Sequence, residues 1–218
     1  MDAKELIARR IALELKDGSL VNLGIGMPNL VAKYLPRDVR VFFQVENGML
    51  GTDHLPEPGL ADDYLADAGG NFISAIPGAC AFDSAFSFGL IRGGHVDATV
   101  LGGLEVDERG LLANWTIPGK MVPGMGGAMD LVTGAKRVIV AMIHTAKGKS
   151  KVLKRCTLPL TSIRRVNLVV TDLAVIEPTE AGLVLKELAP DVTVEQVSAA
   201  TEARLIISPE LREMSLAA

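Results

Sequence analysis

The residue best placed for chemistry in this sequence is Glu46. It directly follows the apolar stretch VRVFFQV (39–45), which predicts a strand, and Asn47 and Gly48 come next. A carboxylate in this position stands at the carboxyl end of a strand, where open α/β sheets bind their ligands. Asn and Gly behind it permit a tight turn. Glu46 is therefore a candidate for binding a ligand or reacting with it. The alternative is that it is a solvated or capping residue at a strand end.

A glycine cluster later in the chain could supply backbone donors for the same chemistry. Gly124, Gly126 and Gly127 follow Pro123 and precede a predicted helix. Glycines so close together expose backbone N–H groups, which can form a nest that stabilises a developing oxyanion. The hydrophobic residues between them favour a packed functional loop over a flexible connector.

An earlier glycine cluster, Gly24 and Gly26 in LGIGMPN, lies between a predicted strand and a predicted helix. This is the place of the glycine-rich fingerprint of dinucleotide-binding proteins, but Asn29 stands at its third glycine position and Pro28 disturbs it. A nicotinamide site is therefore disfavoured. The alternatives that remain are a turn that binds another ligand near a helix N-terminus and a plain tight turn.

The histidines and the basic residues give weaker signals. His144, at a predicted strand end, is the best of the three histidines for an orienting role. His95, beside two glycines, is expected to be a hydrogen-bonded turn residue. His54 lies in a predicted loop. The basic residues between Lys147 and Arg155 fit a solvated hairpin face better than a phosphate site. No Ser/His/Asp or Cys/His arrangement can be argued.

Composition excludes several classes of protein. The chain has 218 residues and a net charge of −4, which does not favour binding to nucleic acid. No apolar run reaches the ~18 residues of a membrane span, and the start MDAKELIARRIALELKDG predicts a helix rather than a signal peptide. Cys80, Cys156 and the three histidines lack metal-ligand spacing. We therefore expect no metal site and a reducing, cytoplasmic compartment.

Strands that alternate with helices must hold the candidate residues in place. Alternation of this kind builds βαβ units, so the sequence predicts an α/β fold with an open, mainly parallel sheet and helices on both faces. We see no internal repeat or linker and expect a single domain over residues 1–218. The predicted strands are 20–23, 39–45, 96–103 and 136–143, with two more in 164–178, and the predicted helices are 3–16, 28–35, 78–91 and a closing helix, 192–203.

Several long stretches, taken together, resemble the beta subunit of class I CoA-transferases, with the acetate–acetoacetate branch the most similar. The resemblance covers essentially the full chain. The stretches that carry it are VNLGIGMPNLVAKYLP (21–36), VENGMLG (45–51), FDSAFSFGLIRGGHVDATVLGGLEV (82–106) and LANWTIPGKMVPGMGGAMDLVTGAKRVIVAM (112–142).

This resemblance implies a fold, a reaction and a site. The fold is an open α/β sheet of the kind shared with some sugar-phosphate isomerases. The reaction moves coenzyme A from an acyl-CoA to a carboxylic acid by ping-pong kinetics, with Glu46 as the catalytic nucleophile. The implied oxyanion loop is Gly124, Gly126 and Gly127. Val45 stands where the family has a serine.

The remaining expectations concern binding. Asn47 and Gly48 are predicted beside the substrate, and Gly24 and Gly26 at coenzyme A. No cofactor is expected, because coenzyme A is a substrate that is transiently covalent on Glu46. The resemblance also implies an alpha-subunit partner, in an αβ or α2β2 assembly.

Two other functions remain open at this point. The first is a sugar-phosphate isomerase on a related sheet, with Glu46 as a proton-shuttling base; turnover of ribose 5-phosphate without coenzyme A would support it. The second is a non-catalytic, ligand-sensing subunit that keeps the fold but does not use Glu46. Indifference to substitution at Glu46 would support that alternative.

Overall fold

The computed structural model describes residues 1–53, 56–57, 59–119 and 124–218. His54 and Pro123, which the sequence analysis names, lie outside these residues. No helix in the described part of the chain is long and apolar enough to cross a membrane.

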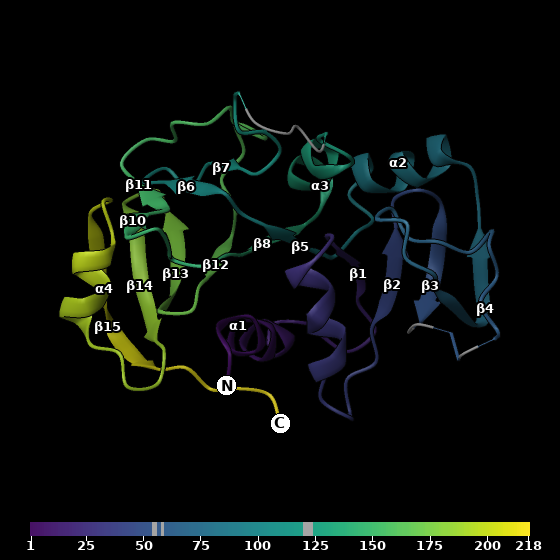
Figure 1. Ribbon diagram of the computed structural model, residues 1–218, viewed down its shortest axis with the longest axis horizontal. Helices are drawn as coiled ribbons and strands as arrows, with labels where there is room; N and C mark the ends of the chain where they lie inside the picture. Colours follow the sequence, from purple (N-terminus) through teal and green to yellow (C-terminus); the bar gives the residue numbers. More distant parts are fainter. Residues whose placement is uncertain (54–55, 58, 120–123) are drawn as a thin grey trace.

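A ten-stranded sheet runs through the molecule in the order β15-β14-β13-β12-β8-β5-β1-β2-β3-β4 (Figure 1). Its five central strands, from β12 to β2, are parallel neighbours. Antiparallel pairs flank them on both sides, and β15 is again parallel to β14. The prediction of an α/β sheet that is mainly parallel is confirmed. The strands are β1 (Leu20–Leu23), β2 (Phe42–Val45), β3 (Met49–Asp53), β4 (Ser74–Ala81), β5 (Ala98–Gly102), β8 (Arg137–Ala141), β12 (Leu168–Val170), β13 (Ala174–Thr179), β14 (Gly182–Leu188) and β15 (Leu205–Glu213).

Helices cover both faces of this sheet, as predicted. Successive strand residues point to opposite faces, so Ile139 of β8 packs into a core with the first two helices, whereas Val138 and Val140 pack into a second core with the others. The helices are α1 (Ala3–Ala12), the 3-10 helix η1 (Met27–Tyr34), α2 (Ser84–Arg92), α3 (Ala128–Gly134) and α4 (Val194–Ala200).

Local capping fixes where three of the helices begin. The side chain of Asp2 accepts a hydrogen bond from Glu5 N at the start of α1, and Asp83 does the same for Phe86 N in α2. Thr193 and Gln196 form a reciprocal capping box at α4. Each cap satisfies backbone donors that a first helical turn leaves unpaired.

Three helix predictions need correction. Residues 78–91 are not one helix, because β4 continues to Ala81 and α2 begins only after the Asp83 cap. Gly78, with a φ of +89°, follows Pro77, and both disfavour a helix there. The helix predicted at 28–35 is a 3-10 helix. The helix in 192–203 does not close the chain, since β15 follows it and pairs with β14.

In the described part of the chain, five short strands lie outside the large sheet. β9 (Thr145–Ala146) and β10 (Lys149–Ser150) form a hairpin, and a three-stranded sheet contains β6 (Glu105–Asp107), β7 (Leu112–Ala113) and β11 (Val152–Leu153). Lys147 turns the hairpin with a φ of +52° and is exposed, as expected for a solvated face. Lys151 is different: it is half-buried and its Nζ donates to Gly103 O. Burial lowers the pKa of its ammonium group.

Candidate active site

Glu46 is the first residue after β2, at the carboxyl end of the parallel strands. Its half-buried side chain meets two donors: Gly127 N donates to Oε1 at 3.1 Å, and Asn22 Nδ2 donates to Oε2 at 3.3 Å. Asn22 comes from β1, which is the parallel neighbour of β2. Each carboxylate oxygen therefore has its own donor, one from the backbone and one from a side chain.

The glycine cluster reaches Glu46 at two of its three positions. Gly127 precedes α3, and a Cβ atom on it would lie 3.0 Å from Glu46 Oε1. At Gly126, where φ is +50°, a Cβ would lie 3.5 Å from the same oxygen. At Gly124 a Cβ would have no neighbour within 4 Å among the residues that the structure describes. The close approach of backbone to carboxylate thus depends on glycine at 127, and Gly124 stands apart from it.

Asn47 and Gly48 hold the turn that carries Glu46. Gly48 has a φ of +132°, and a Cβ on it would come within 2.1 Å of Phe82 O, so only glycine fits. Phe82 N also donates to Gly48 O, which ties this turn to the start of α2. The amide of Asn47 donates to Ala66 O at 2.8 Å. Both residues therefore have structural contacts beside Glu46.

Gly24 and Gly26 differ in their surroundings. Gly24 N donates to Val100 O at 2.8 Å, and a Cβ on Gly24 would meet the same oxygen at 3.1 Å. Gly24 is thus packed against β5. Gly26, with a φ of +85°, precedes η1 and lines a cavity that also reaches Glu46.

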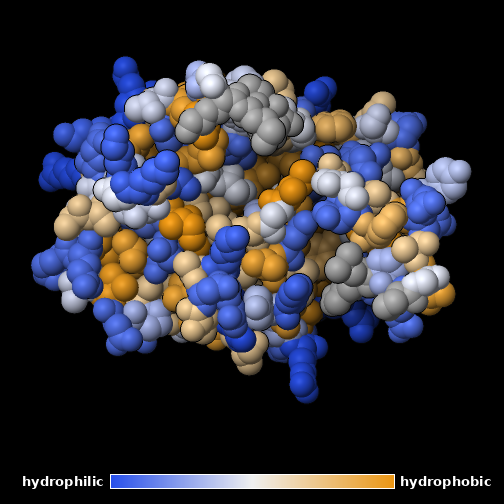
Figure 2. All heavy atoms as spheres, in the orientation of Figure 1, coloured by the Kyte–Doolittle hydropathy of each residue, from blue (hydrophilic) through white to orange (hydrophobic). Residues whose placement is uncertain are grey.

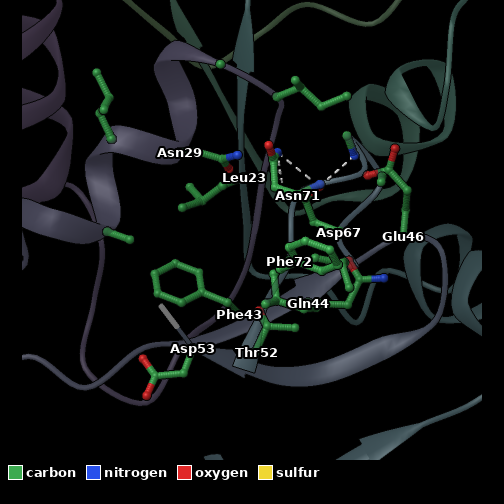
Figure 3. Close-up of a pocket in the computed structure, with 18 of the residues that line it drawn as sticks. Leu23, Asn29, Phe43, Gln44, Glu46, Thr52, Asp53, Asp67, Asn71 and Phe72 are labelled. Carbon is green, nitrogen blue, oxygen red and sulfur yellow. Dashed lines mark hydrogen bonds between the residues drawn. The ribbon is translucent and has the colours of Figure 1, made fainter. Parts of the chain in front are cut away.

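This cavity has a volume of about 650 Å³ and lies between β1, η1, the end of β2 and the loop that precedes β4 (Figure 3). The loop is closed by Asp67, whose carboxylate accepts hydrogen bonds from the backbone of Gly69 and Asn71. Much of the wall is apolar, as expected of a site for an organic ligand. The apolar lining includes Leu23, Ile25, Leu30, Phe43, Phe72 and Ile73, and the polar lining includes Asn29, Lys33, Glu46, Asp53, Asp67 and Asn71.

Three buried polar residues beside Glu46 were not predicted from the sequence. Asn22 and Gln44 occupy paired positions on β1 and β2, and Ser87 lies on α2 above them. All three side chains are buried. For Asn22 and Gln44 the signal in the sequence was a single polar residue inside each otherwise apolar strand, LVNL and FFQV.

His144 has no role at Glu46. It follows β8, which lies three strands from β2 in the sheet, or about 14 Å at the usual strand spacing. Its ring is fully buried and contacts the hydroxyls of Thr171 and Thr201. Burial lowers the pKa of its imidazole to about 4, so the ring is neutral at physiological pH. Among the described residues, no cluster of His, Cys, Asp and Glu is arranged to hold a metal ion.

Comparison with known proteins gives one consistent answer. Residues 4–200 match the family model described as coenzyme A transferase. The acetate CoA-transferase subunit beta of Haemophilus influenzae is 59% identical over 217 residues, covering 99% of this chain and 97% of that protein. The Escherichia coli K12 protein of the same name is 54% identical over 212 residues, covering 97% of each.

A solved structure agrees at the level of the fold. The crystal structure of an acyl-CoA transferase apoenzyme from Escherichia coli O157:H7 matches with a TM-score of 0.79 and 24% sequence identity. The match covers 98% of this chain but only 43% of the longer one.

Proposed function

The chain belongs to the coenzyme A transferase family, and we propose that it is the catalytic beta subunit of an enzyme that moves coenzyme A between an acyl-CoA and a short-chain carboxylic or 3-oxo acid. One observation carries this proposal. The carboxylate of Glu46 lines a largely apolar cavity, and each of its oxygens has a separate hydrogen-bond donor. Such a carboxylate is oriented and partly desolvated, which a nucleophile without a partner base needs.

The names of the relatives support the choice of substrates and partner. Both are called acetate CoA-transferase subunit beta. We infer that acids of the acetate and acetoacetate type are exchanged, and that an alpha subunit completes the enzyme as αβ or α2β2. No further cofactor is proposed, because coenzyme A is itself the group transferred.

Exposed apolar side chains near the site support a contact with another subunit. Hydrophobic side chains reach the surface in several patches between charged ones on the face in Figure 2. Ile25 and Phe72, which line the cavity, are 63% and 43% exposed, and Phe86 of α2 is 57% exposed. Exposed apolar side chains that gather in patches are typical of interaction sites.

The proposed reaction begins with attack by the ionised carboxylate. Glu46 Oε2 has the longer of the two hydrogen bonds and is the oxygen we assign to the attack on the thioester carbonyl. The new C–O bond gives a mixed anhydride between the acyl group and Glu46, and the C–S electron pair leaves as coenzyme A thiolate. The thiolate then attacks Glu46 Cδ, which expels the free carboxylate and leaves a glutamyl-CoA thioester.

The second half of the proposed cycle runs these steps in reverse with another acid. When the thiolate or the acid attacks Glu46 Cδ, negative charge develops on the glutamate oxygen that remains bonded to Cδ throughout. We assign this oxygen to Oε1, where Gly127 N–H donates at 3.1 Å. A backbone donor fixed in this place stabilises the oxyanion without reorganisation. The acceptor acid leaves as a new acyl-CoA, and Glu46 is regenerated.

Detection of the covalent intermediate tests this proposal. The tagged chain is purified from its native source, so that its partner comes with it, and incubated with acetyl-CoA or acetoacetyl-CoA without an acceptor acid. We expect an adduct of coenzyme A mass on the peptide that contains Glu46, labile to hydroxylamine. The same complex with Glu46→Gln is the control and should give none. Absence of the adduct from the unsubstituted complex would contradict the mechanism.

A further inference from the structure

A row of buried polar side chains connects the nucleophile to a helix on the face of the sheet. Ser87 on α2 and Gln44 on β2 have exposed fractions of 0% and 1%, and Asn22 on β1 has 1%. Most of their neighbours in the core on this face are aliphatic. Buried polar groups destabilise a fold unless they are hydrogen-bonded, so a row of them in this place calls for an explanation.

The hydrogen bonds of this row run in one direction. Gln44 Nε2 donates to Ser87 Oγ at 2.8 Å, which leaves Gln44 Oε1 turned toward Asn22. Asn22 Nδ2 donates to Gln44 Oε1 at 2.9 Å and to Glu46 Oε2 at 3.3 Å. If the Gln44 amide were reversed, its nitrogen would face the nitrogen of Asn22, and neither could accept a hydrogen bond from the other. The orientation of Gln44 thus agrees with the orientation of Asn22.

The other end of the Asn22 amide has no anchor. Asn22 Oδ1 is buried and has no hydrogen-bond partner among the described residues. The amide is therefore held through its nitrogen, by the backbone and side-chain oxygens of Gln44 and by Glu46 itself. Glu46 Oε2 is the most distant of these acceptors and the one that must change its bonding during the proposed reaction.

We propose that Gln44 is a positioning residue for the covalent step, which acts by holding the Asn22 amide so that its N–H group faces Glu46 Oε2, with Ser87 fixing Gln44 in turn. This inference rests on the proposed function, since it concerns the rate at which Glu46 forms the glutamyl-CoA thioester. Gln44 lines the cavity, but its side-chain amide is hydrogen-bonded to Ser87 and Asn22 and takes no part in the reacting bond in this scheme. It orients the carboxylate through Asn22, which donates both to Gln44 Oε1 and to Glu46 Oε2.

Thr99 provides a matched control beside this row. It pairs with Asn22 on the neighbouring strand β5 and has an exposed fraction of 0%. Its hydroxyl is buried without a hydrogen-bond partner among the described residues. Thr99→Val keeps the shape and removes only this hydroxyl, so a change in general packing and a change in the Gln44–Asn22 contact can be separated.

The test measures how fast the coenzyme A adduct forms on Glu46 at saturating acyl-CoA, in the full complex with the partner subunit. We expect Gln44→Met to slow formation of the adduct by about tenfold, because Asn22 loses a buried hydrogen bond that orients its amide toward Glu46. The KM for acyl-CoA should change by less than about twofold, because Gln44 is only 1% exposed at the cavity wall and Met fills a similar volume there. Ser87→Ala should give a smaller loss of the same kind, and Thr99→Val none.

A double-mutant cycle identifies the route of the effect. If Gln44 acts through Asn22, Gln44→Met causes no further loss in a chain that already carries Asn22→Ala. Independent, multiplying losses would overturn the inference, and so would a wild-type rate in Gln44→Met. Should Gln44→Met not fold, Ser87→Ala decides, and an unchanged rate there overturns the inference. If the unsubstituted complex forms no adduct, the proposed function itself fails, which is a different result from a normal adduct rate in the variants.

Discussion

At the scale of single residues, the length of the Glu46 side chain sets its contacts with Gly127 and Asn22. Shortening it by one methylene in Glu46→Asp withdraws the carboxylate from both donors. Because a displacement of about 1 Å can cost on the order of 100-fold in rate, we expect turnover to fall by at least that factor. Glu46→Ala should abolish transfer. Steady-state assays of the complex check both, and near-normal turnover in Glu46→Ala would exclude Glu46 as the nucleophile.

Gly127 allows a second prediction at this scale. A Cβ there would lie 3.0 Å from Glu46 Oε1, so the branched side chain of Gly127→Val displaces the carboxylate or the loop. We expect kcat to fall by about 10- to 100-fold, the range for disturbing one oxyanion donor. Gly89→Ala in α2 is the matched control, because a Cβ there meets nothing within 4 Å. Equal kcat values for the two variants would remove the glycine loop from the mechanism.

At this scale, a site residue could be predicted only where the residue types next to it in the sequence suggest its chemistry. Glu46 and the glycines stand in short runs whose types suggest chemistry, and the structure brings Gly126 and Gly127 to Glu46. Asn22 could not be found in this way, since its contact with Glu46 exists only because β1 pairs in parallel with β2. The pairing register of two strands that are distant in sequence cannot be predicted from the sequence of either strand alone.

At the scale of elements, the turn that follows β2 fixes the position of Glu46. Gly48 has a φ of +132°, and a Cβ atom on it would lie 2.1 Å from Phe82 O. We expect Gly48→Ala to lower the free energy of unfolding by more than about 3 kcal/mol, since strain and overlap act together. Gly78→Ala in β4 is the control: its φ is +89° but its surroundings are open, so about 1–2 kcal/mol is expected. Urea unfolding of both variants measures this, and equal losses would contradict the overlap argument.

Helices and strands were predicted correctly where the length of a segment and its hydrophobic pattern agreed. The prediction was wrong where the two did not agree. The two strands in 164–178 are β12 and β13, and 192–203 contains α4, as predicted. The segment 78–91 is largely apolar on both sides of Asp83, and periodicity does not separate a buried strand from a helix in such a run. The Asp83 cap is the local signal that divides it, because Asp favours the position before a helix.

At the scale of the whole molecule, ion pairs join the two ends of the chain. Glu187 of β14 accepts hydrogen bonds from Arg10 of α1 and from Arg212 of β15. Burial alone would raise the pKa of the Glu187 carboxyl, but the hydrogen bonds from Arg10 and Arg212 outweigh burial and lower it. The stability that this network contributes is therefore present above the ordinary range of a glutamate and is lost only at more acidic pH. This network could not be predicted from the sequence, because β14 and β15 were not predicted.

His144 gives the molecule a separate sensitivity to acid at a higher pH. Burial, opposed by Asp172 and assisted by Lys151, lowers the pKa of its imidazole from 6.5 to about 4. Between these values the unfolded chain binds a proton that the folded chain does not, so lowering the pH favours unfolding. We expect the free energy of unfolding to fall by about 3 kcal/mol from this residue between neutral pH and pH 4. His144→Gln, which does not titrate, should flatten the curve over that interval and leave the more acidic loss from Glu187. Chemical unfolding at a series of pH values tests this, and equal slopes for both proteins between pH 6.5 and 4 would show that the ring does not control acid stability.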